Sequence, residues 1–111
     1  MEVQTKFEHK NDLIYHGHCP IKECPDNYIG ETERRISERI IDHQGRDTHS
    51  HLLKHAIEAN HRHVTGENFK ILNNGFRNNT LKRRIAESLL IRENKPTLNK
   101  KEKSLELKLY N

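Results

Sequence analysis

Two tyrosines, an arginine and a histidine in the first half of the chain could do phosphodiester chemistry together. Tyr15 and Tyr28 lie in two short β-prone segments, and Arg39 and His43 are four residues apart in the helical segment that follows. Residues four apart lie on one side of a helix, so Arg39 and His43 can face the same surface. A phenol or an imidazole can take a proton from water, and an arginine can hold a phosphate. This group lacks a carboxylate for a divalent cation, and Glu87 is the candidate.

Two cysteines, Cys19 and Cys24, form a second group of reactive side chains. A disulfide between them would close a small loop and stabilise the chain little, whereas paired cysteines near many histidines are typical of zinc sites. Zinc takes four nitrogen or sulfur ligands, and the spacing of His55 and His61 is usual for the second pair. His61 and His63 could serve instead, and further histidines compete: His16, His18, His49 and His51. We expect a closed, structural zinc site, separate from the catalytic metal.

Short periodic segments must position these side chains. We expect strands over 12–16, 27–30 and 68–72, with both cysteines in the loop of the first hairpin. Helices are expected from Thr32, as N-cap, to His43, over 50–60, and from Thr80 to about residue 92. The order ββααβα predicts an α+β fold with a small three-stranded antiparallel sheet flanked by helices. Residues 104–110 could form a short helix or a strand.

Apolar spacing predicts the buried faces of the helices. Ile36 and Ile40 form one ridge in the first helix. The buried residues expected in the second helix are Leu52, Leu53, Ala56 and Ile57. Those expected in the third helix are Leu81, Ile85, Ser88 or Leu89, and Leu90.

The order of the motifs resembles that of the GIY-YIG endonuclease family. Leu13-Ile14-Tyr15 stands where the family has Gly-Ile-Tyr, with a leucine in place of the glycine, and Tyr28-Ile29-Gly30 matches the second motif. Three later segments resemble the following blocks: Arg39 with His43, Arg83 to Ser88 around Glu87, and Pro96 to Asn99. The cysteines between the tyrosine motifs, with His55 and His61 downstream, look most like the Cys-Cys-His-His zinc site of Penelope-like retroelement endonuclease domains.

The resemblance implies a GIY-YIG-like fold and hydrolysis of one DNA strand, which leaves a 3′-hydroxyl that would prime reverse transcription. Glu87 would bind the single Mg2+ or Mn2+ ion, and Tyr15 and Tyr28 would flank the attacking water. The remaining roles would be charge stabilisation by Arg39, support of the proton network by His43, and positioning of the glutamate's surroundings by Asn99. The domain would be fused to, or act with, a reverse transcriptase, and DNA as substrate implies the nucleus.

Each motif also has an ordinary structural interpretation. Tyr28-Ile29-Gly30 is a common tripeptide, and Glu87 follows Arg83 and Arg84 at a spacing that allows a simple ion pair. Asn99 stands after a Pro-Thr turn, where a loop asparagine is common. The occurrence of all the motifs in order favours an active nuclease. The alternatives are a zinc-stabilised nucleic-acid-binding module without cleavage activity, and a lysine-rich protein-interaction domain.

Length, composition and net charge limit the size of the core and the kinds of partner. The chain has 111 residues, of which 32% are hydrophobic and 5% aromatic, so its core must be thin and a bound metal would help to stabilise it. Lysine and arginine number 20 against 16 acidic residues, which favours an anionic partner such as DNA. Apolar runs are too short to span a membrane, and we expect no secretory signal. We expect a flexible arm over 1–10, the endonuclease domain over 11–100 and a basic segment over 101–111.

Overall fold

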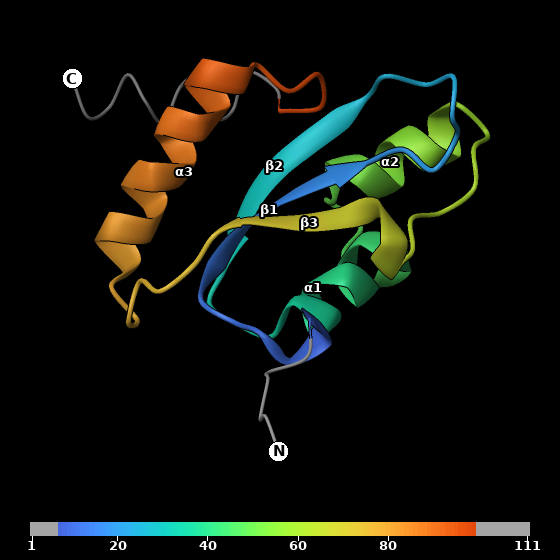
Figure 1. Cartoon of the computed structure of the whole chain (residues 1–111). Helices are drawn as coiled ribbons and strands as arrows, with labels where there is room; N and C mark the ends of the chain where they lie inside the picture. Colours follow the sequence, from blue (N-terminus) through green and yellow to red (C-terminus); the bar gives the residue numbers. More distant parts are fainter. Residues whose placement is uncertain (1–6, 100–111) are drawn as a thin grey trace.

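Three β-prone segments pair into one antiparallel sheet in the computed structural model, which describes residues 7–99 (Figure 1). The strands are β1 (Leu13–His18), β2 (Asn27–Thr32) and β3 (Phe69–Asn73), in the spatial order β2-β1-β3. The predicted α+β architecture with a three-stranded antiparallel sheet is confirmed. The basic segment 101–111 and most of the expected N-terminal arm lie outside the described residues.

Helices lie on both faces of this sheet, with α3 on one side and α1 and α2 on the other (Figure 1). The longer helices are α1 (Ile36–Ile41), α2 (His51–Glu58) and α3 (Thr80–Asn94). Three short helical turns complete the order: η1 (Phe7–His9), η2 (Asp42–Arg46) and η3 (Gly66–Asn68). Among residues 7–99, none of these helices combines the length and the apolar character that crossing a bilayer requires.

Alternation along β1 divides the core into two parts, because neighbouring side chains point to opposite faces of the sheet. Leu13 and Tyr15 are fully buried on the face covered by α1 and α2. Ile14, also fully buried, packs on the α3 face with Ile29 and Phe76. The part of the core on the α1 and α2 face is the larger, with nine buried hydrophobic residues, whereas the part on the α3 face has three.

The first helix begins later than predicted. Thr32 ends β2, and α1 begins at Ile36 after Arg35 in an extended conformation. His43 lies in η2, a π-helical turn, so the α-helix does not continue to this residue. Local spacing predicted one helix because Ile36, Ile40 and His43 fit its period, whereas the chain changes its helical pitch after Ile41.

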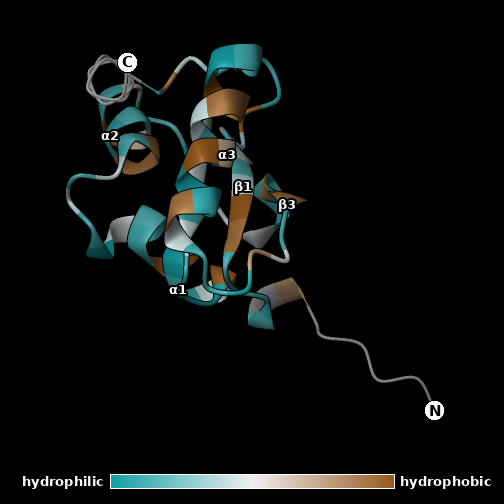
Figure 2. Ribbon diagram, turned by 90° about the vertical axis from the view of Figure 1, so that its left-hand side faces the viewer, coloured by the Kyte–Doolittle hydropathy of each residue, from teal (hydrophilic) through white to brown (hydrophobic). Residues whose placement is uncertain are grey.

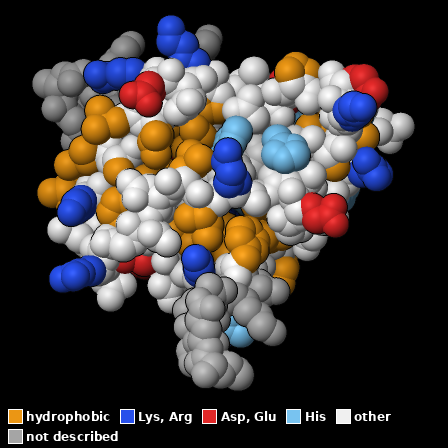
Figure 3. All heavy atoms as spheres, in the orientation of Figure 1, with side chains coloured by type: hydrophobic (Ala, Val, Ile, Leu, Met, Phe, Trp, Pro, Cys, Tyr) orange, Lys and Arg blue, Asp and Glu red, His pale blue; other side chains and the backbone are white. Residues whose placement is uncertain are grey.

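The solvent-facing side of α3 carries apolar side chains that the sequence pattern predicted to be buried (Figures 2 and 3). Leu81, Ile85 and Leu89 are 67%, 52% and 57% exposed, so their predicted burial is wrong, as is that of Ile57 in α2, which is 64% exposed. The buried positions of α3 include Arg83 and Glu87, with Ala86, Leu90 and Ile91 packed against the core. Ion pairs of Arg83, described below, fix this rotation of the helix.

Candidate functional site

The pairing of β1 with β2 places Tyr15 opposite Gly30. A Cβ atom at Gly30 would lie 2.6 Å from Cζ of Tyr15 and 2.8 Å from Cε2 of Tyr28, and closer still to the Tyr15 hydroxyl oxygen. The glycine therefore leaves the space in which the Tyr15 ring crosses β2. On the other side of β1, Leu72 is an extra residue between the partners of Ile14 and Tyr15, so a bulge lies beside this tyrosine.

The hydroxyl group of Tyr15 is the centre of the site. Its oxygen lies 2.8 Å from Nε2 of His43 and accepts a hydrogen bond of 3.1 Å from Nε of Arg39. The Tyr28 ring lies 6.3 Å from the Tyr15 ring and 5.7 Å from the imidazole, between ring centroids. Four residues that sequence spacing placed on one surface are thus brought together, and His51 of α2 extends the group at 5.9 Å from Tyr28.

Burial keeps the two proton-carrying groups neutral. Burial, with a contribution from Tyr28, raises the pKa of Tyr15 well above 10.0, although Arg39 acts in the opposite direction. Burial and the positive charge of Arg39 lower the pKa of His43 to about 3. At neutral pH, His43 therefore has one ring N–H, and its other nitrogen can accept a proton.

Two aspartates hold the guanidinium of Arg39. Its Nη1 donates to Asp42 at 3.1 Å and to Asp47 at 3.3 Å. Asp42 also receives bonds from Arg34 and Arg46, and these hydrogen bonds outweigh burial and lower the pKa of Asp42 to about 2. The helical spacing of three residues between Arg39 and Asp42 favours an ion pair, and the structure contains it. The contact with Asp47 was not predicted, because it depends on the turn in η2.

Glu87 is buried in α3, 4% exposed, and its charge contributes to the raised pKa of Tyr15. Its neighbour in the helix, Arg83, donates to Asp12 at 2.6 Å and to Glu31 at 2.5 Å. The spacing of Arg83 and Glu87 allowed an ion pair between them. The guanidinium of Arg83 has two carboxylate partners from outside α3. Asp12 and Glu31 also escaped prediction, since they are distant from α3 in the sequence.

Asn99 binds the outer edge of β2. Its side-chain amide donates to the carbonyl of Ile29 and accepts from the N–H of Ile29, both at 2.8 Å. Leu98 adds a backbone bond to Asn27 of the same strand. Asn99 therefore acts on the strand that carries Tyr28, and it reaches this place because the turn after α3 returns the chain to the sheet.

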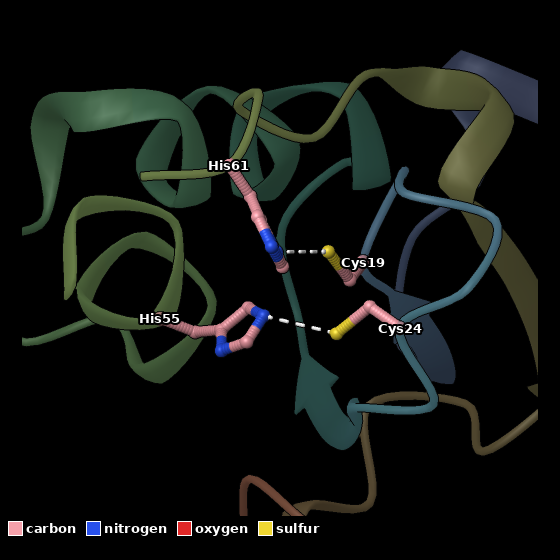
Figure 4. A group of neighbouring side chains, drawn as sticks. All are labelled: Cys19, Cys24, His55 and His61. Atoms are coloured by element: carbon pink, nitrogen blue, oxygen red, sulfur yellow. Dashed lines mark hydrogen bonds between the residues drawn. The ribbon is translucent and has the colours of Figure 1, made fainter. Parts of the chain in front are cut away.

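The second site is a cluster of two thiols and two imidazoles (Figure 4). Cys19 Sγ lies 3.2 Å from Nδ1 of His61, and Cys24 Sγ lies 3.4 Å from Nε2 of His55. The four ligand atoms lie within 4.8 Å of one another. In tetrahedral zinc sites, bonds of about 2.0–2.3 Å place ligand atoms roughly 3.3–3.8 Å apart, so this cluster could hold a metal ion and is compatible with structural zinc.

Contacts around this cluster resolve which histidines belong to it. His63, the alternative to His55, is exposed and its Nδ1 bonds the carbonyl of Gln44. His55 instead faces Cys24 with Nε2 and Asp26 with Nδ1, at 3.4 Å from the carboxylate. A carboxylate on the far nitrogen is the usual partner of a metal-binding histidine, because it fixes the tautomer and the ring orientation. Sequence spacing did not identify Asp26.

In comparisons with known proteins, no family model matches this chain, and no curated protein or solved structure matches it.

Proposed function

We propose that this chain is a metal-dependent DNA endonuclease of the GIY-YIG type, most like the endonuclease domain of Penelope-like retroelements. The observation that carries the proposal is the contact of a guanidinium and an imidazole with one buried phenol, that of Tyr15. One partner is enough to satisfy a buried tyrosine hydroxyl. The imidazole supplies an acceptor for the phenol proton and the guanidinium supplies a cation beside the phenol oxygen, and both favour proton transfer, whereas burial opposes it by holding the two groups neutral.

The proposed reaction is hydrolysis of one phosphodiester. Water attacks the phosphorus atom, the bond from phosphorus to O3′ breaks, and O3′ takes a proton from solvent, so the products are a 3′-hydroxyl and a 5′-phosphate. Tyr15 takes the proton of the water after its own proton passes to His43, and Tyr28 flanks the water. Arg39 stabilises the charge on the phosphoryl oxygens. Its side chain is 20% exposed while Tyr15 is fully buried, so the phosphate approaches from the side of Arg39.

Glu87 is the proposed ligand of Mg2+ or Mn2+. Within residues 7–99, the Cys-His cluster is the one group of three or more side chains suited to a metal, so Glu87 would act as a single carboxylate. Mg2+ accepts such sites, because it keeps several waters and takes phosphate oxygens from its substrate. When bound, the ion would act as a Lewis acid toward a phosphoryl oxygen. Asn99 would support this region through β2.

The zinc site and the partners complete the proposal. Zn2+ bound by Cys19, Cys24, His55 and His61 would be structural, since four protein ligands leave no open position for a substrate. The biological role would be to nick DNA and so prime reverse transcription by a fused or associated polymerase domain in the nucleus. The net charge of +4 is compatible with a DNA substrate.

A nicking assay with supercoiled plasmid tests this function. We expect the zinc-loaded protein to convert plasmid to the open circular form with Mg2+ or Mn2+. Glu87→Gln removes the charged oxygen and should lower the rate about 100-fold or more, while DNA binding is retained. Glu93→Gln is the matched control, because Glu93 is an exposed carboxylate in the same helix, and its rate should equal that of the wild type.

Other results would contradict the proposal. Salt-sensitive DNA binding by all variants without nicking by the wild type would support the inactive zinc-stabilised module. Equal nicking by wild type and Glu87→Gln would show that Glu87 is not the metal ligand.

A further inference from the structure

Both ring nitrogens of His43 face a hydroxyl group. Nε2 lies 2.8 Å from the hydroxyl oxygen of Tyr15, and Nδ1 lies 2.5 Å from Oγ of Ser50. His43 is 1% exposed and Ser50 is 3% exposed, so water does not compete for these bonds. Ser50 has no part in the proposed bond-breaking steps, yet it is the hydrogen-bond partner of Nδ1, the ring nitrogen that faces away from Tyr15.

Ser50 has a fixed position because it caps the N-terminus of α2. Its Oγ accepts the backbone N–H of Leu53 at 3.1 Å, which makes it the N-cap of this helix. A hydroxyl oxygen has two lone pairs, so one remains for a second donor. The cap therefore presents an oriented acceptor to Nδ1 of His43.

We propose that Ser50 is a positioning residue for His43: its Oγ accepts the Nδ1–H proton, which leaves Nε2 free to accept the proton of the Tyr15 hydroxyl. This inference rests on the proposed endonuclease function and specifies how its proton network is held. The opposite arrangement has Ser50 donating to Nδ1 and His43 donating from Nε2. In that arrangement Nε2 cannot accept the tyrosine proton, so the transfer would be blocked.

The proposed tautomer allows the transfer without rearrangement of the ring. The O–H bond of Tyr15 breaks and an N–H bond forms at Nε2, while the Nδ1–H bond to Ser50 stays in place. The product is an imidazolium beside a phenolate, and Arg39 donates to that phenolate oxygen. The phenolate then takes a proton from the attacking water, O3′ takes a proton from solvent as it leaves, and His43 returns its extra proton to solvent, so the proton count closes.

Some groups around the imidazole oppose this proton transfer and others favour it. The charged or titratable groups facing it are Arg39, Asp42, Asp47, His51, Tyr15 and Tyr28. Burial and Arg39 favour the neutral ring, whereas Asp42 and Asp47 favour the charged ring. An acceptor on Nδ1 also favours the charged ring, because the N–H of the imidazolium donates a stronger hydrogen bond than the N–H of the neutral ring.

Substitutions at Ser50 separate the two arrangements. Ser50→Asp keeps an N-cap acceptor but cannot donate, so it enforces the Nδ1–H tautomer. We expect Ser50→Asp and Ser50→Thr to nick plasmid within tenfold of the wild-type rate, and Ser50→Ala to lose 10- to 100-fold, roughly what removal of such a supporting partner costs. We also expect Ser50→Asp to shift the acidic limb of the pH–rate profile upward. Thr48→Ala is the control, because Thr48 is exposed and lies two residues before the cap.

A direct measurement of the tautomer does not depend on cleavage. The 15N chemical shifts of the His43 ring should show protonated Nδ1 in the wild type and in Ser50→Asp. Protonated Nε2 in the wild type, or wild-type nicking by a folded Ser50→Ala, would overturn the inference. If the wild type did not nick DNA at all, the proposed function would fail, while the nitrogen shifts would still decide the role of Ser50.

Discussion

At the scale of single residues, the space left by Gly30 decides where the Tyr15 hydroxyl lies. Tyr15 crosses β2 where a side chain at position 30 would overlap its ring. Position 30 is in a strand and does not need a left-handed backbone. The requirement for glycine there is therefore one of space, and the site depends on it directly.

Gly30→Ala should move the Tyr15 ring away from His43 and Arg39. We expect a loss of about 1–3 kcal/mol in the free energy of unfolding, the usual cost of inserting a methyl group into a packed region. Plasmid nicking should fall by at least about tenfold, since a small misplacement of a reacting group is costly. Urea denaturation and the nicking assay measure the two effects. Gly66→Ala is the control, because no atom lies within 4 Å of its Cβ position, and a similar loss there would contradict this explanation.

Residue types and short spacings predicted the central side chains of the site but not their supports. Tyr15, Tyr28, Arg39 and His43 carry recognisable chemistry and lie on neighbouring elements. Supporting residues contact them through turns whose geometry no local pattern specifies, as the contacts of Ser50 and Asp47 show. A serine at a helix N-cap has a sufficient explanation in the helix alone, so its contact with His43 could not be predicted from the sequence.

At the scale of elements, α2 connects the two sites. Its N-cap Ser50 contacts His43, and His55, five residues further along, belongs to the thiol–imidazole cluster. The other cluster residues are in the loop of the β1–β2 hairpin and in the segment after α2. A metal ion bound there would join the hairpin that carries both tyrosines to the helix that holds the imidazole.

Removal of the metal should therefore reduce both stability and nicking. We expect a chelator, or the substitution His61→Ala, to lower the melting temperature by at least about 10 °C, because 1 kcal/mol corresponds to roughly 4–8 °C in a domain of this size. Calorimetry and metal analysis measure this, and Co2+ substitution should show thiolate charge-transfer bands. His63→Ala should keep one bound metal and the wild-type melting temperature. Metal loss in His63→Ala, with retention in His55→Ala, would assign the second pair of ligands to His61 and His63.

The order of strands and helices was predicted better than which side of each helix is buried. Strand and helix order follow from apolar periods, and the structure confirms the sheet. The face of α3 did not follow, because the period of Leu81, Ile85 and Leu89 competes with ion pairs that Arg83 makes to residues distant in sequence. Burial of Arg83 requires both of its carboxylate partners, and a pattern within one helix cannot show where these partners lie.

At the scale of the whole molecule, buried His43 makes stability depend on pH. Its pKa is about 3 in the folded chain against 6.5 ordinarily, so the unfolded chain binds more protons between these values. Stability therefore falls as the pH drops below about 6.5, by up to about 1.4 kcal/mol per pH unit. Urea denaturation between about pH 7 and 4.5 measures the slope. His43→Gln should flatten it, whereas His49→Gln, which replaces an exposed histidine, should not. Equal slopes in all three proteins would contradict this assignment.

The two hydrogen bonds between Asn99 and Ile29 affect how copies of this molecule can associate. Strand edges with unpaired backbone groups invite the strands of other chains. Asn99 occupies the outer edge of β2 at its middle, so in the part of the chain that the structure describes, β3 alone offers a free edge. A unit with one such edge can join a second unit once, and the joined sheet then ends at a blocked edge on each side. Within residues 7–99, edge-to-edge association through β3 would therefore give pairs, and further growth through β2 would require Asn99 to leave Ile29.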